Sequence, residues 1–151
     1  MREILFRGKD IDTNEWRYGA YYNGVHGGGL SKIYEPHESL IIDEHTEVFH
    51  RVLSETVGQF TGIDDMNGNK IFEGDIVRIS SRPDLTNNQI KRGFLHHKKK
   101  GLVTFDKGRW VAKRQLNEGS YYNIGLYDDD YEFAIIGNIH NNAELLEEEL
   151  K

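Results

Sequence analysis

The sequence predicts a mainly β protein: a strongly bent antiparallel sheet or a small, partly open barrel, SH3-like in part, with one short C-terminal helix. Short runs of alternating apolar and polar residues recur between turn residues, which is typical of an all-β domain. Sixteen glycines and only two prolines fit many tight turns. Aromatic residues make up 11% of the chain and hydrophobic residues 37%, which favours a compact β domain over a helical bundle.

The N-terminal third of the chain contains four candidate strands. Each run is rich in β-branched and aromatic residues, which fit a pleated strand. In the first run Ile4 and Phe6 share one face, and a polar turn separates it from the second, where Trp16 faces the same way as Tyr18. The predicted strands are residues 3–7, 15–22, 39–43 and 46–52.

The segment 57–79 is predicted to form strands joined by two turns. Phe60 and Ile76 alternate with glycine or polar neighbours, so both are expected in the core. Asn67 and Gly68 form the strongest turn signal in the chain, and Gly68 is expected at positive φ. Nearby carboxylates are interpreted as turn caps, because they lack the alternating ligand spacing of a calcium loop. They are Asp64, Asp65, Glu73 and Asp75.

The C-terminal part is predicted to contain a hairpin, two further strands and the helix. The strands are expected at residues 101–106, 109–114, 121–127 and 131–139. Asn141 or Asn142 can cap a helix that continues through Leu150. Leu146 and Leu150 lie four residues apart, on the face of the helix that would pack on the sheet.

Several of these segments form a recognisable set. Residues 57–62 read Val-Gly-Gln-Phe-Thr-Gly, the Asn67-Gly68 turn follows, and residues 72–77 read Phe-Glu-Gly-Asp-Ile-Val. Further agreement lies at residues 2–7, 101–105 and 136–146. This set resembles the YopX family of phage and prophage proteins, whereas the loops at 22–45 and 80–100 match it poorly. The resemblance implies a small β-rich phage protein, with no established activity and no catalytic residues.

The composition restricts the class of protein. The 151 residues include no cysteine, which excludes disulfides and cysteine-ligated zinc. No apolar run approaches the roughly 18 residues of a membrane span, and the first residues do not resemble a signal peptide. We therefore expect a protein of the bacterial host cytoplasm with no membrane contact. We expect one domain over residues 1–151, with an irregular basic arm at about 80–100.

Charge is strongly segregated along the chain. Residues 78–114 hold eleven Lys and Arg and two acidic residues, a formal +9, so the other residues hold 8 basic and 23 acidic ones, or −15. The basic arm is either a solvated hairpin tip or a binding surface for nucleic acid or an acidic protein surface. In the second interpretation cations hold phosphates and a ring stacks on a base. The candidate binding residues are Lys91, Arg92, Phe94, Lys98, Lys99 and Lys100.

Recognisable catalytic motifs are absent from the sequence. No nucleophile elbow, dinucleotide fingerprint or zinc-protease motif occurs, so no catalytic residue, metal or cofactor is predicted. His37, His45 and His50 lie among acidic residues and are interpreted as solvated. We expect a non-enzymatic phage accessory module that binds nucleic acid or a host or phage protein. The alternatives are a structural protein that assembles as a homo-oligomer and, with least support, a hydrolase using the histidine region.

Overall fold

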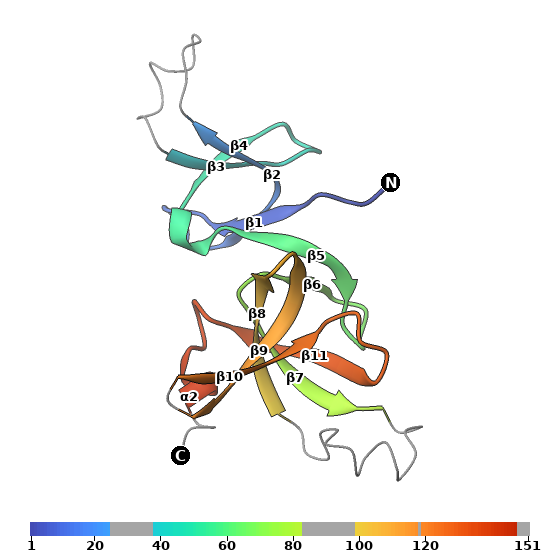
Figure 1. The fold of residues 1–151 in the computed structure, drawn as a ribbon. Helices are drawn as coiled ribbons and strands as arrows, with labels where there is room; N and C mark the ends of the chain where they lie inside the picture. Colours follow the sequence, from blue (N-terminus) through green and yellow to red (C-terminus); the bar gives the residue numbers. More distant parts are fainter. Residues whose placement is uncertain (25–37, 83–98, 118, 148–151) are drawn as a thin grey trace. The chain divides into compact units, whose positions relative to one another are not determined.

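The computed structural model describes residues 1–24, 38–82, 99–117 and 119–147 (Figure 1). The chain folds as two compact units, an N-terminal unit, Met1–Phe60, and a C-terminal unit, Thr61–Lys151. Strand β5 (Gly58–Asp64) carries the chain from the first unit into the second.

The N-terminal unit is an antiparallel sheet. Its strands lie in the order β4-β3-β2-β1, and the start of β5 pairs with β1. Gly19 has φ +155°, and a Cβ there would lie 1.8 Å from the Ile42 carbonyl oxygen, so only glycine fits where β2 meets β3. The elements are β1 (Phe6–Lys9), β2 (Trp16–Gly24), β3 (Glu38–Ile42), β4 (Phe49–Val52) and the 3-10 turn η1 (Ser54–Thr56).

The first strand differs from its sequence prediction. It ends at Lys9, and Ile4 lies before it with 65% of its surface exposed. Arg7 and Lys9 are buried instead, because the Arg7 guanidinium carbon lies 4.4 Å from the centre of the Trp16 ring and the Lys9 ammonium 5.6 Å from it. Both charged groups lie over the ring in a cation–π arrangement, which a pattern of apolar residues does not reveal.

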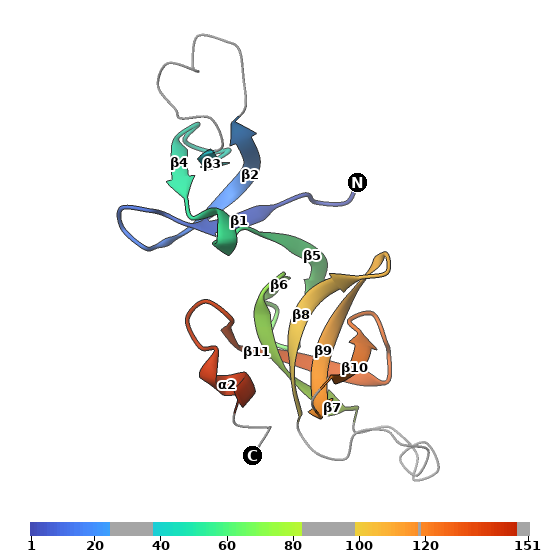
Figure 2. The same cartoon turned by 60° about the vertical axis from the view of Figure 1, so that its left-hand side comes forward.

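The C-terminal unit contains a five-stranded antiparallel sheet in the order β10-β9-β8-β7-β11, with β8 and β9 forming a long curved hairpin (Figure 2). Its core includes Val77, Ile79 and Val103, packed with Trp110 and Phe133. The elements after β5 are β6 (Lys70–Phe72), β7 (Asp75–Ser81), β8 (Lys99–Asp106), β9 (Arg109–Asn117), β10 (Ser120–Gly125), β11 (Tyr131–Asn138) and the helix α2 (Glu144–Glu147).

The central turns have their predicted chemistry. Gly68 has φ +82°, as the Asn67-Gly68 turn requires. Asp65 accepts hydrogen bonds from the backbone N–H groups of Asn67 and Asn69, and Asp75 accepts one from that of Phe72. Both carboxylates therefore cap turns. Phe60 and Ile76 are buried, as predicted.

The predicted fold class is confirmed. In the part of the chain that the structure describes, strands dominate, the two sheets do not close into a barrel, and one short α-helix follows the last strand. The described residues contain no helix with the length and apolar character needed to cross a membrane.

Candidate nucleic-acid interface

The predicted basic arm, at about 80–100, is described only at its two ends, residues 80–82 and 99–100. Lys91, Arg92, Phe94 and Lys98 lie outside the described residues. Lys99 and Lys100 begin β8, and successive residues of a strand point to opposite faces of the sheet. Lys99 is paired with the core residue Ile79, whereas Lys100 is paired with Arg78 on the other face, the outer face. The two neighbouring lysines therefore lie on opposite faces of the sheet.

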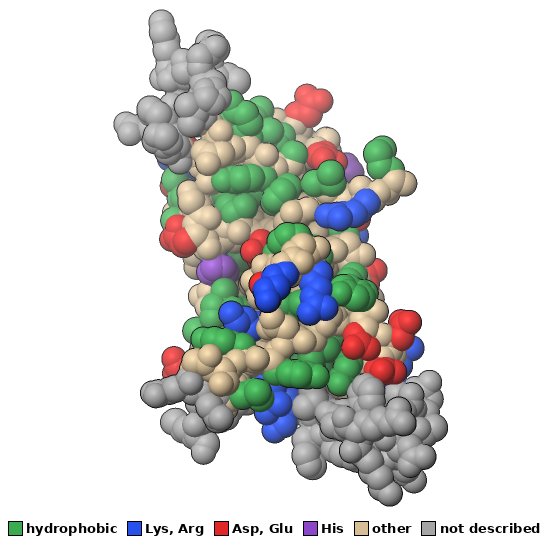
Figure 3. Space-filling view, viewed as in Figure 1, with side chains coloured by type: hydrophobic (Ala, Val, Ile, Leu, Met, Phe, Trp, Pro, Cys, Tyr) green, Lys and Arg blue, Asp and Glu red, His purple; other side chains and the backbone are tan. Residues whose placement is uncertain are grey.

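The outer face carries a row of cations that crosses three adjacent strands. Arg78 on β7 is paired with Lys100 on β8, and Lys113 on β9 is paired with Leu102, two residues after Lys100. On the edge strand β10, Tyr121 is paired with Gln115, which lies two residues after Lys113 and therefore on the same face of β9. Tyr121 thus continues this row. Lys and Arg side chains gather over β8 and β9 in Figure 3. We call Arg78, Lys100, Lys113 and Tyr121 the basic face.

A cavity of about 280 Å³ opens on the basic face. The Lys113 ammonium lies 4.1 Å from the centre of the Tyr121 ring, and the Lys100 ammonium donates a hydrogen bond of 3.1 Å to the carbonyl oxygen of Leu145. Tyr121 remains 53% exposed. The arrangement offers positive charge beside an accessible aromatic ring and an apolar floor. Its lining residues are Lys100, Leu102, Lys113, Gln115, Tyr121 and Leu146.

Lys100 was among the binding residues predicted from the sequence, whereas Lys113 and Tyr121 were not. Lys113 lies inside the basic segment 78–114, yet only the strand register shows that it shares a face with Lys100. Tyr121 lies eight residues beyond Lys113, across the β9–β10 turn. The sequence did contain one signal for this pair. Lys113 and Arg114 on β9 precede Tyr121 and Tyr122 on β10, and a hairpin between these two strands brings cations next to tyrosines.

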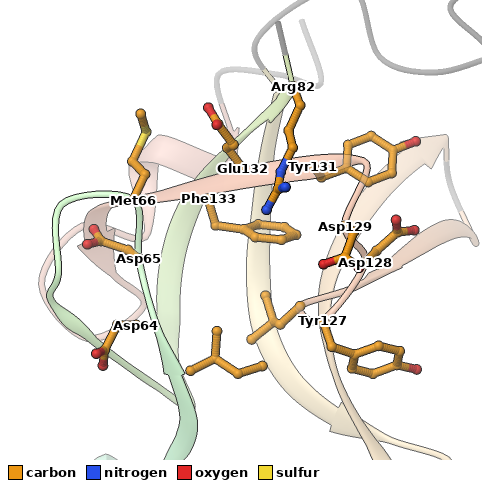
Figure 4. A pocket seen from close by; sticks show the side chains of 12 residues that line it. Asp64, Asp65, Met66, Arg82, Tyr127, Asp128, Asp129, Tyr131, Glu132 and Phe133 are labelled. Carbon is orange, nitrogen blue, oxygen red and sulfur yellow. The ribbon is translucent and has the colours of Figure 1, made fainter. Parts of the chain in front are cut away.

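A second cavity, of about 520 Å³, has the opposite charge (Figure 4). It lies at the β5–β6 and β10–β11 turns, and the Arg82 side chain extends into it from the end of β7. Burial raises the pKa of the Tyr131 phenol above its ordinary value, and Tyr122, Asp128 and Asp130 add to this effect. Five carboxylates beside one arginine give this cavity a negative local field, which disfavours a polyanion. The acidic lining residues are Asp64, Asp65, Asp128, Asp129 and Glu132.

Comparison with known proteins identifies the family. A family model described as YopX protein matches residues 5–147. The chain belongs to the YopX family. The chain is also similar to the crystal structure of protein EF1440 from Enterococcus faecalis, with 20% identity, a TM-score of 0.45, and coverage of 97% of this chain and 99% of that chain. No curated protein matches it.

Of the three histidines singled out in the sequence, His50 takes part in a local ion-pair arrangement with Asp10. His37 lies outside the described residues, and His45 is exposed. His50 Nδ1 lies 3.5 Å from Asp10 Oδ2, and the Arg17 Nε donates to the same oxygen at 3.0 Å. Backbone N–H groups of Asp12 and Thr13 together with Arg17 lower the pKa of Asp10 to about 2, although burial opposes them. Across the described residues, no group of three or more His, Cys, Asp or Glu is placed to hold a metal ion.

Proposed function

We propose that this YopX-family protein is a non-enzymatic phage or prophage accessory module that binds single-stranded nucleic acid on its basic face. The observation that carries this proposal is the Lys113 ammonium held 4.1 Å from the centre of the exposed Tyr121 ring, in a cavity that Lys100 also lines. Proteins that bind single strands combine a positively charged groove with aromatic side chains on which bases stack. The basic face contains both components.

The form of the basic face favours a single strand over a duplex. Sequence reading of duplex DNA usually places an α-helix or a two-stranded ribbon in the major groove. Among the described residues, the α-helix spans only Glu144–Glu147, which is too short for that role. The β8–β9 hairpin is paired with β7 and β10 on its two sides, so it is not a free two-stranded ribbon. A single strand, in contrast, exposes its bases and can place one against Tyr121 while its phosphates approach Lys113 and Arg78.

The charge distribution supports the same proposal. The described residues of the basic segment, 78–82 and 99–114, carry eight Lys and Arg and one acidic residue, Asp106. Phosphate neutralisation supplies most of the affinity in sequence-independent binding. The acidic cavity would repel a strand that strayed toward the β10–β11 turn, and this repulsion would favour the basic face.

Fluorescence anisotropy with a labelled oligothymidylate tests the proposal. We expect the parent protein to bind at low salt and Tyr121→Ala to lose about 1–3 kcal/mol, roughly fivefold to more than a hundredfold in affinity. Tyr22→Ala is the matched control, because Tyr22 is also exposed, at 44%, but lies on β2. It should bind like the parent.

Absence of binding by the parent at low salt would refute the proposal. Sedimentation of the same samples then distinguishes the alternative. Assembly that disappears at high salt would indicate that the basic face pairs with acidic surface on a second copy of the chain.

A further inference from the structure

The C-terminal helix α2 lies against β8 on the basic face. The Lys100 ammonium donates its hydrogen bond to Leu145 O, inside this helix, and Leu146 forms one wall of the cavity that contains Lys113 and Tyr121. The helix therefore binds the Lys100 ammonium and covers an apolar surface, both of which a nucleic-acid strand would otherwise contact.

The helix is held weakly. Its described part, Glu144–Glu147, has four residues and none of them is buried. The backbone N–H of Leu145 donates to Asn142 and that of Leu146 to Ala143, which closes little more than one turn. Isolated helices shorter than about 12 residues are marginal in water, so α2 depends on its contacts with the sheet. Loss of those contacts would unfold it at small cost.

The helix is negatively charged, as is the single-stranded nucleic acid that we propose as the ligand. Glu144 and Glu147 are both exposed acidic residues on α2. Like a phosphate backbone, they give the helix negative charge, and the Leu145 carbonyl oxygen accepts a hydrogen bond from the Lys100 ammonium. A strand bound across Lys113 and Lys100 would compete with the helix for the same donor.

We infer that α2 is an autoinhibitory cover of the basic face, displaced when a nucleic-acid strand binds. This inference rests on the proposed function. A protein whose binding-competent form is only partly populated binds with an affinity reduced by that fraction, so weakening the cover raises the apparent affinity. The segment 139–143 is not part of the cover, because Ile139 N–H donates to Gly74 and Asn142 packs against Gly137.

The first test compares oligothymidylate binding by the full chain and by a variant that ends at Ala143. We expect the truncated chain to bind about threefold to tenfold more tightly. Leu146→Ala, which keeps every charge, should also bind more tightly than the parent. Circular dichroism melts report whether the truncated chain folds. If it does not, Leu146→Ala gives the result.

The control separates displacement from simple charge removal. The variant Glu144→Gln/Glu147→Gln/Glu148→Gln/Glu149→Gln loses the same four carboxylates as the truncated chain and keeps Leu146 and the Leu145 carbonyl. Its gain in affinity should disappear at about 0.5 M salt, where exposed charges are screened, whereas the gain of the truncated chain should persist. Equal gains at every salt concentration would overturn the inference, because the helix would then act through charge alone.

Hydrogen exchange of the full chain gives a second and direct measurement. Saturating oligothymidylate should speed exchange of the Leu145 and Leu146 amides, because displacement breaks their hydrogen bonds. Unchanged or slower exchange with the strand bound would overturn the inference. If the parent binds but neither truncation nor Leu146→Ala improves binding, the inference fails alone. If no variant binds, the proposed function fails with it.

Discussion

The Asp65 carboxylate is buried at the turn between β5 and β6, where it connects two distant parts of the chain. One oxygen accepts the backbone N–H groups of Asn67 and Asn69, and the other accepts that of Ile135 on β11. Burial alone would raise the pKa of the Asp65 carboxyl, but these three donors outweigh it and hold the pKa below its ordinary value. The charged form therefore stabilises the fold.

Replacement of Asp65 tests this role. Asp65→Asn should reduce the free energy of unfolding by about 1–3 kcal/mol near pH 7, because an amide cannot satisfy all three donors equally. Since the folded-state pKa is lowered, the stabilisation is present above the ordinary pKa and is lost as the pH falls through the folded-state value. Urea melts of parent and variant should therefore begin to converge only as the pH falls below about 4, near the ordinary pKa of an aspartate. A difference that does not change with pH would show that the carboxylate charge contributes nothing.

At the scale of elements, alternation in the sequence located most of the strands. Val77 and Ile79 on β7 face the core, while Arg78 between them faces outward, as the period of two requires. The first strand was misplaced, because its buried residues, Arg7 and Lys9, are cations that cover Trp16. Long basic side chains bury their stems in ways that hydrophobic patterns do not detect.

The candidate site was less predictable than the strands. Lys113 and Tyr121 meet only because β9 and β10 pair in one particular register, with an irregularity between Ser120 and Tyr121. A shift of one residue would place either side chain on the other face. The clustering of basic residues was visible in the sequence, whereas the choice of face for each one required the fold.

The assignment of the core predicts a contrast between two isoleucines. Ile79 on β7 is fully buried, and Ile4, before β1, is 65% exposed. Ile79→Ala should therefore cost about 2–5 kcal/mol through lost contacts and the cavity that remains. Ile4→Ala makes the same chemical change and should stay within about 0.5 kcal/mol of the parent. Urea melts measure both, and equal losses would show that the core is assigned wrongly.

Across the whole chain, the net charge of −6 conceals regions of opposite sign. The basic segment includes β8 and most of β9, whereas five carboxylates line the cavity at the β5–β6 and β10–β11 turns. Local fields of this kind can attract a ligand that the net charge would repel. Membership of the YopX family agrees with the fold and leaves the activity to be tested on these surfaces.

The salt dependence of oligothymidylate binding tests the central claim most directly. The logarithm of affinity should fall linearly with the logarithm of salt concentration, with a slope of about −0.7 for each phosphate neutralised on a single strand. Arg78→Gln/Lys113→Gln removes two cations of the basic face and should make the slope shallower by roughly 1.4. Lys107→Gln/Arg109→Gln removes the same charge at the β8–β9 turn and should leave the slope close to that of the parent. Equal slopes for both double variants, or no binding by the parent at low salt, would contradict the account.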